Sequence, residues 1–211
     1  MKHFFEFMRK PRVHRSCQLL MLVSTLFLAG QLLCACGVPT WLTDAQNILA
    51  LATSSAGAIL GFFGTLSGNP ALAAAAALLT GIFTDIEKGI TDVETLVSEY
   101  NENPSDTLLQ NIEAGAQLVI TNLKKVLTDA FPEVPAALVT KVQAVAQLLL
   151  TQFEAWSSLI PAAKAALTAG SQITISVPYT SKAYKKLFND TFATPTGDAA
   201  IDEALPKVKR L

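Results

Sequence analysis

The 211 residues include 16 Lys and Arg, 17 Asp and Glu, and two histidines, His3 and His14. From residue 36 onward, 11 cations stand against 16 acids, and this net charge of −5 disfavours nucleic-acid binding, which needs clustered cations. That part of the chain has no histidine and one cysteine, which excludes a Ser-His-Asp triad and a Cys/His zinc site. We expect no catalytic residues, no metal and no cofactor, although an enzyme that uses carboxylates alone is an open alternative.

The N-terminal segment has the parts of a secretory signal. The first sixteen residues carry five cations and one acid, and an uncharged run follows from Cys17 to Ala35. This run is somewhat short for a transmembrane helix, which needs about 20 apolar residues, because it includes Gln18 and Gln31. We therefore predict a signal peptide over residues 1–35.

The run ends in LCAC, residues 33–36, which resembles the lipobox of bacterial lipoproteins. The resemblance implies cleavage after Ala35, lipidation of Cys36, and a lipidated N-terminus and linker over residues 36–43. Gly37 follows this cysteine instead of Asp, which in Gram-negative lipoproteins implies delivery to the outer membrane, facing the periplasm or the exterior. The alternatives are an ordinary cleaved signal and an uncleaved anchor.

Turn motifs divide the following residues into long segments in which apolar residues recur three and four positions apart. Short connections between long helices make those helices antiparallel neighbours. We therefore predict an all-α fold, an antiparallel bundle of about four long helices over residues 44–170, in which Ser105 or Asp106 caps the third helix. The turn motifs are SGNP (67–70), NENPS (101–105), FPEVP (131–135) and AGSQ (169–172).

The stretch from Ala45 to Thr84 has no charged residue, and its expected first helix, 44–67, carries small residues spaced three and four apart. Each glycine inside a helix costs about 1 kcal/mol relative to alanine, so several on one face suggest a close approach of another helix. We predict a buried helix-packing seam against the alanines that follow; the alternative is a membrane-inserting hairpin over residues 45–84. The seam residues are Ser54, Gly57, Gly61, Gly64 and Gly68.

The four-residue pattern IE-x-G occurs twice, at 86–89 and 112–115. It either marks an internal repeat of helical hairpins or reflects chance similarity between amphipathic helices. The sequence leaves both interpretations open.

The pattern changes after Gly170, where apolar and polar residues alternate as in a half-buried strand. A strand without a partner in its own chain either lies along the bundle or pairs with another molecule. We predict that residues 171–211 form this strand and short helices packed on the bundle. The strand, which is the candidate partner-pairing segment, consists of Ile173, Thr174, Ile175, Ser176 and Val177.

The last part of the chain predicts a short amphipathic helix in SKAYKKLFNDTF (181–192) and a final helix capped by Thr196 or Asp198. Residues 164–211 carry a net charge of +3, whereas residues 36–163 carry −8. The basic end, which includes Lys207, Lys209 and Arg210, is either solvated or touches anionic lipid or the acidic bundle.

The sequence thus predicts a non-catalytic, lipid-anchored protein of the bacterial cell envelope with a structural, scaffold or binding role. Its expected contacts are the membrane, through the N-terminal lipid, and a protein partner or a second copy. The alternative is a membrane-perturbing or pore-forming protein that uses the hairpin 45–84.

Overall fold

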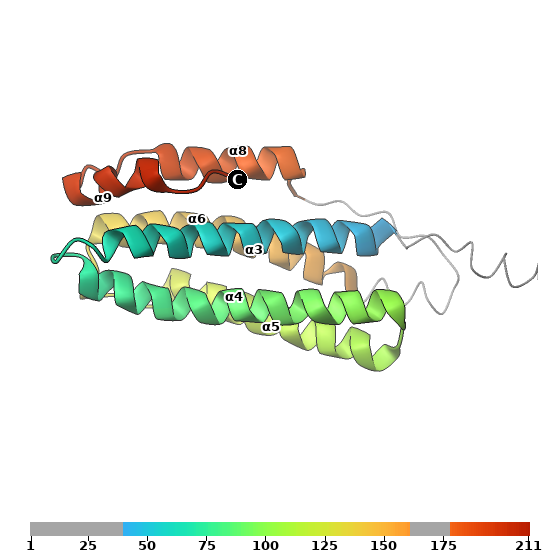
Figure 1. The fold of residues 1–211 in the computed structure, drawn as a ribbon. Helices are drawn as coiled ribbons and strands as arrows, with labels where there is room; N and C mark the ends of the chain where they lie inside the picture. Colours follow the sequence, from blue (N-terminus) through green and yellow to red (C-terminus); the bar gives the residue numbers. More distant parts are fainter. Residues whose placement is uncertain (1–39, 161–177) are drawn as a thin grey trace, which may run out of the picture. The chain divides into compact units, whose positions relative to one another are not determined.

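The structure is a computed structural model that describes residues 40–160 and 178–211 (Figure 1). Within these ranges the chain forms helices and turns and no strand, so the prediction of an all-helical fold is confirmed. The signal peptide 1–35, the lipidation site Cys36 and the predicted strand 173–177 lie outside the described residues.

Four long helices account for most of the described chain, and short connections bring each of them back alongside the one before it (Figure 1). The first begins at Thr40, inside the segment 36–43 that the sequence assigned to a linker. The prediction of that boundary is wrong because the helical pattern continues upstream of Asp44. The helices are α3 (Thr40–Leu66), α4 (Ala73–Glu102), α5 (Asp106–Thr128) and α6 (Ala136–Ser157).

Local sequence explains where these helices begin and end. Of the two predicted caps of α5, Ser105 is the one used: its Oγ accepts a hydrogen bond from the amide of Leu108 at 3.2 Å. Pro104 precedes it and cannot continue α4. Between α3 and α4, the Asn69 side chain accepts from the amide of Ala71 at 2.9 Å and closes the turn.

The inward faces of the four helices form one apolar core. Burial of each large apolar side chain there contributes about 1.5–3 kcal/mol. Phe63 of α3 packs edge-on against Phe83 of α4, with ring centroids 5.5 Å apart. Fully buried core residues include Leu49, Phe63, Phe83, Ile90, Val97, Ile112, Val119, Leu149, Phe153 and Trp156.

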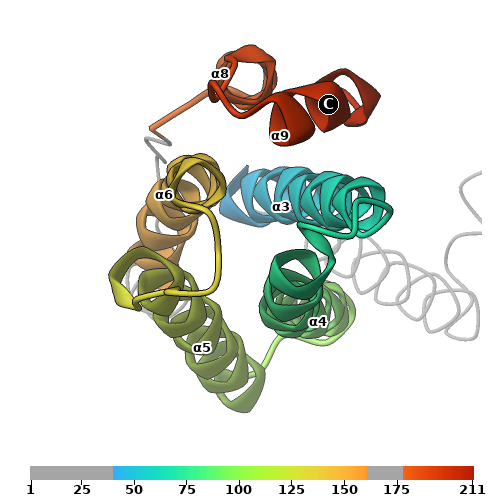
Figure 2. The ribbon, with the colours of Figure 1, turned by 90° about the vertical axis from the view of Figure 1, so that its left-hand side faces the viewer.

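Residues 181–211, which we call the strap, fold into short helices that lie over α3 and α6, on the side opposite α4 and α5 (Figure 2). Thr180 caps the first helix by accepting from the amide of Ala183 at 3.3 Å. Asp198, one of the two predicted caps, accepts from the amides that open the second helix. The elements are α8 (Ser181–Ala193), α9 (Ala199–Ala204) and the single 3-10 turn η1 (Leu205–Lys207).

Candidate interaction site

The predicted helix-packing seam lies on the outside of α3 and on the turn that follows it. All five of its residues are exposed. A Cβ added at Gly61 or Gly64 meets no atom within 4 Å, and one at Gly57 meets only the Glu87 carboxylate, at 3.7 Å. The prediction that Ser54, Gly57, Gly61, Gly64 and Gly68 pack closely against alanines is therefore wrong within the described chain.

The opposite face of α3 explains this result. Ala52, Ala56, Ile59 and Phe63 are spaced four, three and four apart and are buried. This stripe gains more from burial than glycines do, because the gain grows with the apolar area removed from water, at about 25 cal/mol per Å². The larger apolar residues therefore take the core, and the small ones are left on the surface.

A close approach of helices does occur, but between α4 and α5. A Cβ on Gly115 would lie 2.8 Å from Val93 Cγ2, and a Cβ on Gly89 would lie 3.0 Å from Val119 Cγ2. Each glycine precedes the valine of its own helix by four residues, so the contact is reciprocal. The two IE-x-G sequences thus end in the glycines that allow α4 and α5 to pack tightly, a role that the sequence analysis did not assign to them.

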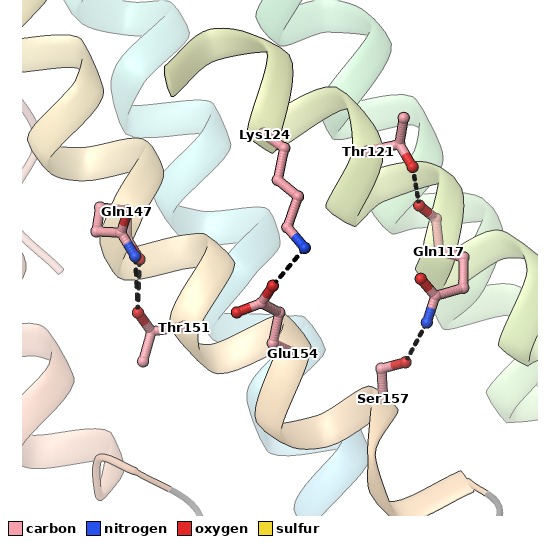
Figure 3. Close-up of polar contacts among 7 residues, drawn as sticks. All are labelled: Gln117, Thr121, Lys124, Gln147, Thr151, Glu154 and Ser157. Atoms are coloured by element: carbon pink, nitrogen blue, oxygen red, sulfur yellow. Dashed lines mark hydrogen bonds and ion pairs between the residues drawn. The ribbon is translucent and has the colours of Figure 1, made fainter. Parts of the chain in front are cut away.

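Polar side chains connect α5 to α6 along their outer faces (Figure 3). Lys124 and Glu154 form an ion pair at 2.7 Å, with about half of each side chain exposed. Gln117 donates a hydrogen bond from Nε2 to the Ser157 hydroxyl at 3.0 Å. An exposed ion pair such as Lys124–Glu154 contributes about 0–1 kcal/mol, so we assign it to helix alignment and not to a functional site.

Aromatic side chains join the strap to α3. Tyr184, Phe188 and Phe192 recur every four residues along α8 and are buried. The ring of Phe192 meets Phe62 of α3 edge-on, with centroids 5.4 Å apart. The predicted amphipathic helix therefore buries its aromatic face on the bundle, whereas Leu187 of the same helix is 38% exposed.

A buried hydrogen bond fixes the middle of this contact. Ser55 Oγ donates to the carbonyl of Leu51 at 2.7 Å and lies 3.0 Å from the Tyr184 hydroxyl. Because the Ser55 proton is already directed to Leu51, Tyr184 donates to Ser55. Burial raises the pKa of Tyr184 far above its usual value, and the hydrogen bond with Ser55 opposes that rise only in part. Tyr184 therefore stays protonated in the folded protein.

Lys141 of α6 holds the other end of α8. Only 7% of this residue is exposed, and its ammonium group donates to the carbonyls of Thr191, at 2.6 Å, and Thr194. Carbonyls at a helix C-terminus lack partners within the helix and favour a cation. Burial lowers the pKa of Lys141, and the nearby carboxylate of Asp202 opposes that decrease. Lys141 is thus a cap supplied by one helix to another.

The described ranges contain no group of three or more His, Cys, Asp and Glu side chains that could hold a metal ion. Two helical segments, Leu42–Leu66 and Ala136–Ser157, are long and apolar enough to cross a membrane by length and composition alone. In each of them, half of an 18-residue apolar window is buried inside the bundle.

No protein-family model, no curated protein and no solved structure matches this chain.

Proposed function

We propose that this chain is a lipid-anchored protein of the bacterial cell envelope, in which an antiparallel four-helix bundle has a structural, scaffold or binding role and not a catalytic one. The observation that carries the proposal is the sequence LCAC at 33–36, placed after a basic segment and an uncharged run. Stable anchoring needs more than one acyl chain, and the lipoprotein class that LCAC resembles carries several on the residue corresponding to Cys36. The proposed location is the outer membrane, facing the periplasm or the exterior.

The start of the helical body supports such an anchor. The first described helix begins at Thr40, four residues after Cys36. An extended chain spans at most about 3.6 Å per residue, so this tether would reach no more than about 14 Å. A lipid on Cys36 would therefore hold the bundle close to the bilayer.

The outer face of α3 supports a binding or scaffold role. Ala50, Ser54, Gly57, Gly61 and Gly64 are exposed along it, without a charged residue from Ala45 to the end of the helix. Charged residues are depleted in the cores of protein interfaces. This face is where we expect a protein partner or a second copy to bind.

A second candidate function is membrane perturbation by the hairpin 45–84. The observation that favours it is the absence of charge from Ala45 to Thr84, together with the length and composition of Leu42–Leu66. Insertion would require Phe62 and Phe63 to leave the core, where both are buried. We rank this function second because that cost has no evident compensation in the folded bundle.

The anchor is tested by Cys36→Ser, with Cys34→Ser as the matched control. We expect Cys36→Ser to abolish acyl labelling and either to release the protein from membranes or to leave an uncleaved precursor. Cys34→Ser should keep the label, because Gln31 would stand at the position where the lipobox has Leu if Cys34 were the acceptor. Mass spectrometry that finds an unmodified N-terminus at another residue in the wild-type protein would refute the anchor.

Dye-loaded liposomes separate the two candidate functions. The purified full chain should leave the dye enclosed if it serves as a scaffold. Rapid release at low protein concentration, suppressed by a charge placed at Gly61 (Gly61→Asp), would instead support the hairpin.

A further inference from the structure

Charge is divided unevenly between the strap and the bundle. Residues 40–160 contain 4 cations and 12 acids, whereas residues 178–211 contain 6 cations and 4 acids. All six of these cations are exposed. The strap is therefore a basic layer on an acidic bundle.

The four acids of the strap already have hydrogen-bond or ion-pair partners within the strap. Asp198 caps α9, and Asp202 accepts hydrogen bonds from the amide and hydroxyl of Thr196, which lower the pKa of the carboxyl group. The other two acids form exposed pairs within their helices, Asp190 with Lys186 at 2.5 Å and Glu203 with Lys207 at 3.4 Å. Among the described residues, Lys182, Lys185, Lys209 and Arg210 have no acidic partner.

These four cations and Lys186 lie along one edge of the strap. Lys182, Lys185 and Lys186 are three and four residues apart on α8, away from its buried aromatic residues. Arg210 donates to the carbonyl of Asn189 at 2.9 Å, which brings the segment after η1 alongside α8. We call these residues the basic edge: Lys182, Lys185, Lys186, Lys209 and Arg210.

Four exposed acidic side chains belong to α4, on the other side of the bundle from the strap. Figure 2 shows α8 and α9 over α3 and α6, with α4 on the opposite side. Exposed acids recur along α4 at spacings of seven and three residues, with Lys88 as the one cation of that helix. A molecule with one basic and one acidic side suits contact with a flat anionic surface. The acids are Asp85, Asp92, Glu99 and Glu102.

The basic edge also lies toward the start of the bundle. Tyr184, between Lys182 and Lys185, lines the same small cavity as Ile48 and Leu51. Those α3 residues stand eight and eleven positions after Thr40, about 12–17 Å along the helix. A tether at Cys36 would therefore hold the basic edge within reach of the membrane.

We propose that the basic edge binds the anionic phospholipid headgroups of the membrane to which the chain is anchored, and lays the bundle against that membrane with α4 facing away. The inference rests on the proposed lipid anchor, which keeps the chain at the surface. Each Lys or Arg close to an anionic surface favours binding about fivefold. Leu187, exposed on the same helix, adds apolar contact.

Lysine reactivity tests this orientation on the full processed chain. The chain is incorporated into phosphatidylcholine vesicles and into vesicles in which about a third of the lipid is phosphatidylglycerol. Mass spectrometry then follows the acetylation rate of each lysine, with Lys88 as the internal control. We expect Lys182, Lys185 and Lys186 to react about threefold more slowly on the anionic vesicles and to recover in about 0.5 M salt, which screens exposed charges. Equal rates on both vesicles would overturn the proposal.

Matched charge-reversal variants show whether the basic edge itself causes the slower acetylation. Lys182→Glu/Lys185→Glu/Lys186→Glu should abolish the slower acetylation of Lys209, the remaining lysine of the basic edge, whereas Lys88→Glu/Lys124→Glu/Lys125→Glu, with the same change in charge, should keep it. Circular dichroism checks that both variants are folded. Slow acetylation at high protein concentration without vesicles would indicate that the basic edge binds the acidic α4 of a second copy, which overturns the membrane assignment.

Flotation with vesicles distinguishes this proposal from the anchor. If the chain floats with both kinds of vesicle and its lysines are acetylated at equal rates on both, the proposal for the basic edge is contradicted and the proposal of the anchor is not. A chain that floats with neither contradicts both the anchor and the basic edge.

Discussion

Two pairs of helical glycines in this protein have opposite surroundings. On α3, Gly61 and Gly64 have open space where a side chain would be. Between α4 and α5, Gly89 and Gly115 each receive a valine methyl group of the other helix at 3.0 Å or less from where a Cβ would stand. The comparison shows that a glycine inside a helix does not by itself indicate whether another helix packs against it.

The position of each glycine relative to the apolar stripe makes the difference. Gly89 and Gly115 are half-buried, and each faces a valine of the other helix where α4 and α5 meet. On α3, Gly61 and Gly64 are exposed although each adjoins a buried phenylalanine in sequence. Each of these exposed glycines costs the helix about 1 kcal/mol without a packing gain among the described residues.

The largest expected effect comes from a leucine placed in each pair. Gly115→Leu should lower the free energy of unfolding by up to about 3 kcal/mol, because its Cβ would stand 2.8 Å from Val93 Cγ2 and valine is stiff at χ1. Gly61→Leu should raise that free energy by about 0.5–1 kcal/mol, because leucine is the better helix former and meets no neighbour. Urea unfolding of both variants measures the two changes in the free energy of unfolding. Changes in the same direction would contradict the contrast between the two pairs of glycines.

A second test compares two adjacent serines of α3, the exposed Ser54 and the buried Ser55. Ser55→Ala should cost about 2 kcal/mol, because the buried hydroxyl of Tyr184 loses its acceptor. Ser54→Ala, one residue earlier and exposed, should be neutral or slightly stabilising. Thermal unfolding compares the pair. Equal costs would show that the contact between the strap and α3 is not ordered in solution.

A smaller expected effect tests the contact between Ser55 and Tyr184 through the pH dependence of stability. The pKa of Tyr184 is raised in the folded state, so its contribution is fully present below the unfolded value near 10 and is lost as the pH rises above it. Wild-type stability should therefore fall between pH 10 and pH 11 by about 1 kcal/mol more than that of Tyr184→Phe. Urea titrations at the two pH values measure the two slopes. Parallel slopes would indicate that the Tyr184 hydroxyl is open to water.

Much of the fold could be predicted because helical periodicity and caps are local. The turn motif NENPS (101–105) and the amphipathic sequence over residues 181–192 were enough to predict α5 and α8. The contacts between elements were not predictable in this way. Lys141 caps carbonyls 50 and 53 residues later in the chain, and nothing in its neighbouring sequence indicates that role.

Whether the predicted seam is buried could not be predicted from local sequence either. The small residues of α3 are present at the predicted spacing, but the spacing did not reveal which face would be buried. That choice depends on the packing of the whole bundle, where Ile59 and Phe63 gain more from burial than any glycine. Cys36 and the strand Ile173–Val177 stay predictions, because they lie outside the described residues.

The hydrogen bond between Ser55 and Tyr184 joins residues 129 positions apart, and this separation has a consequence for the order of folding. Contacts between residues far apart in sequence form late, because the chain between them loses conformational entropy before the contact contributes any stabilisation. The strap also needs Lys141 of α6, so it can dock only after the helices beneath it have assembled. While the chain folds, Phe62 and its neighbours on α3 therefore stay uncovered until the strap packs onto them. A chaperone that binds apolar segments has its longest opportunity at this surface.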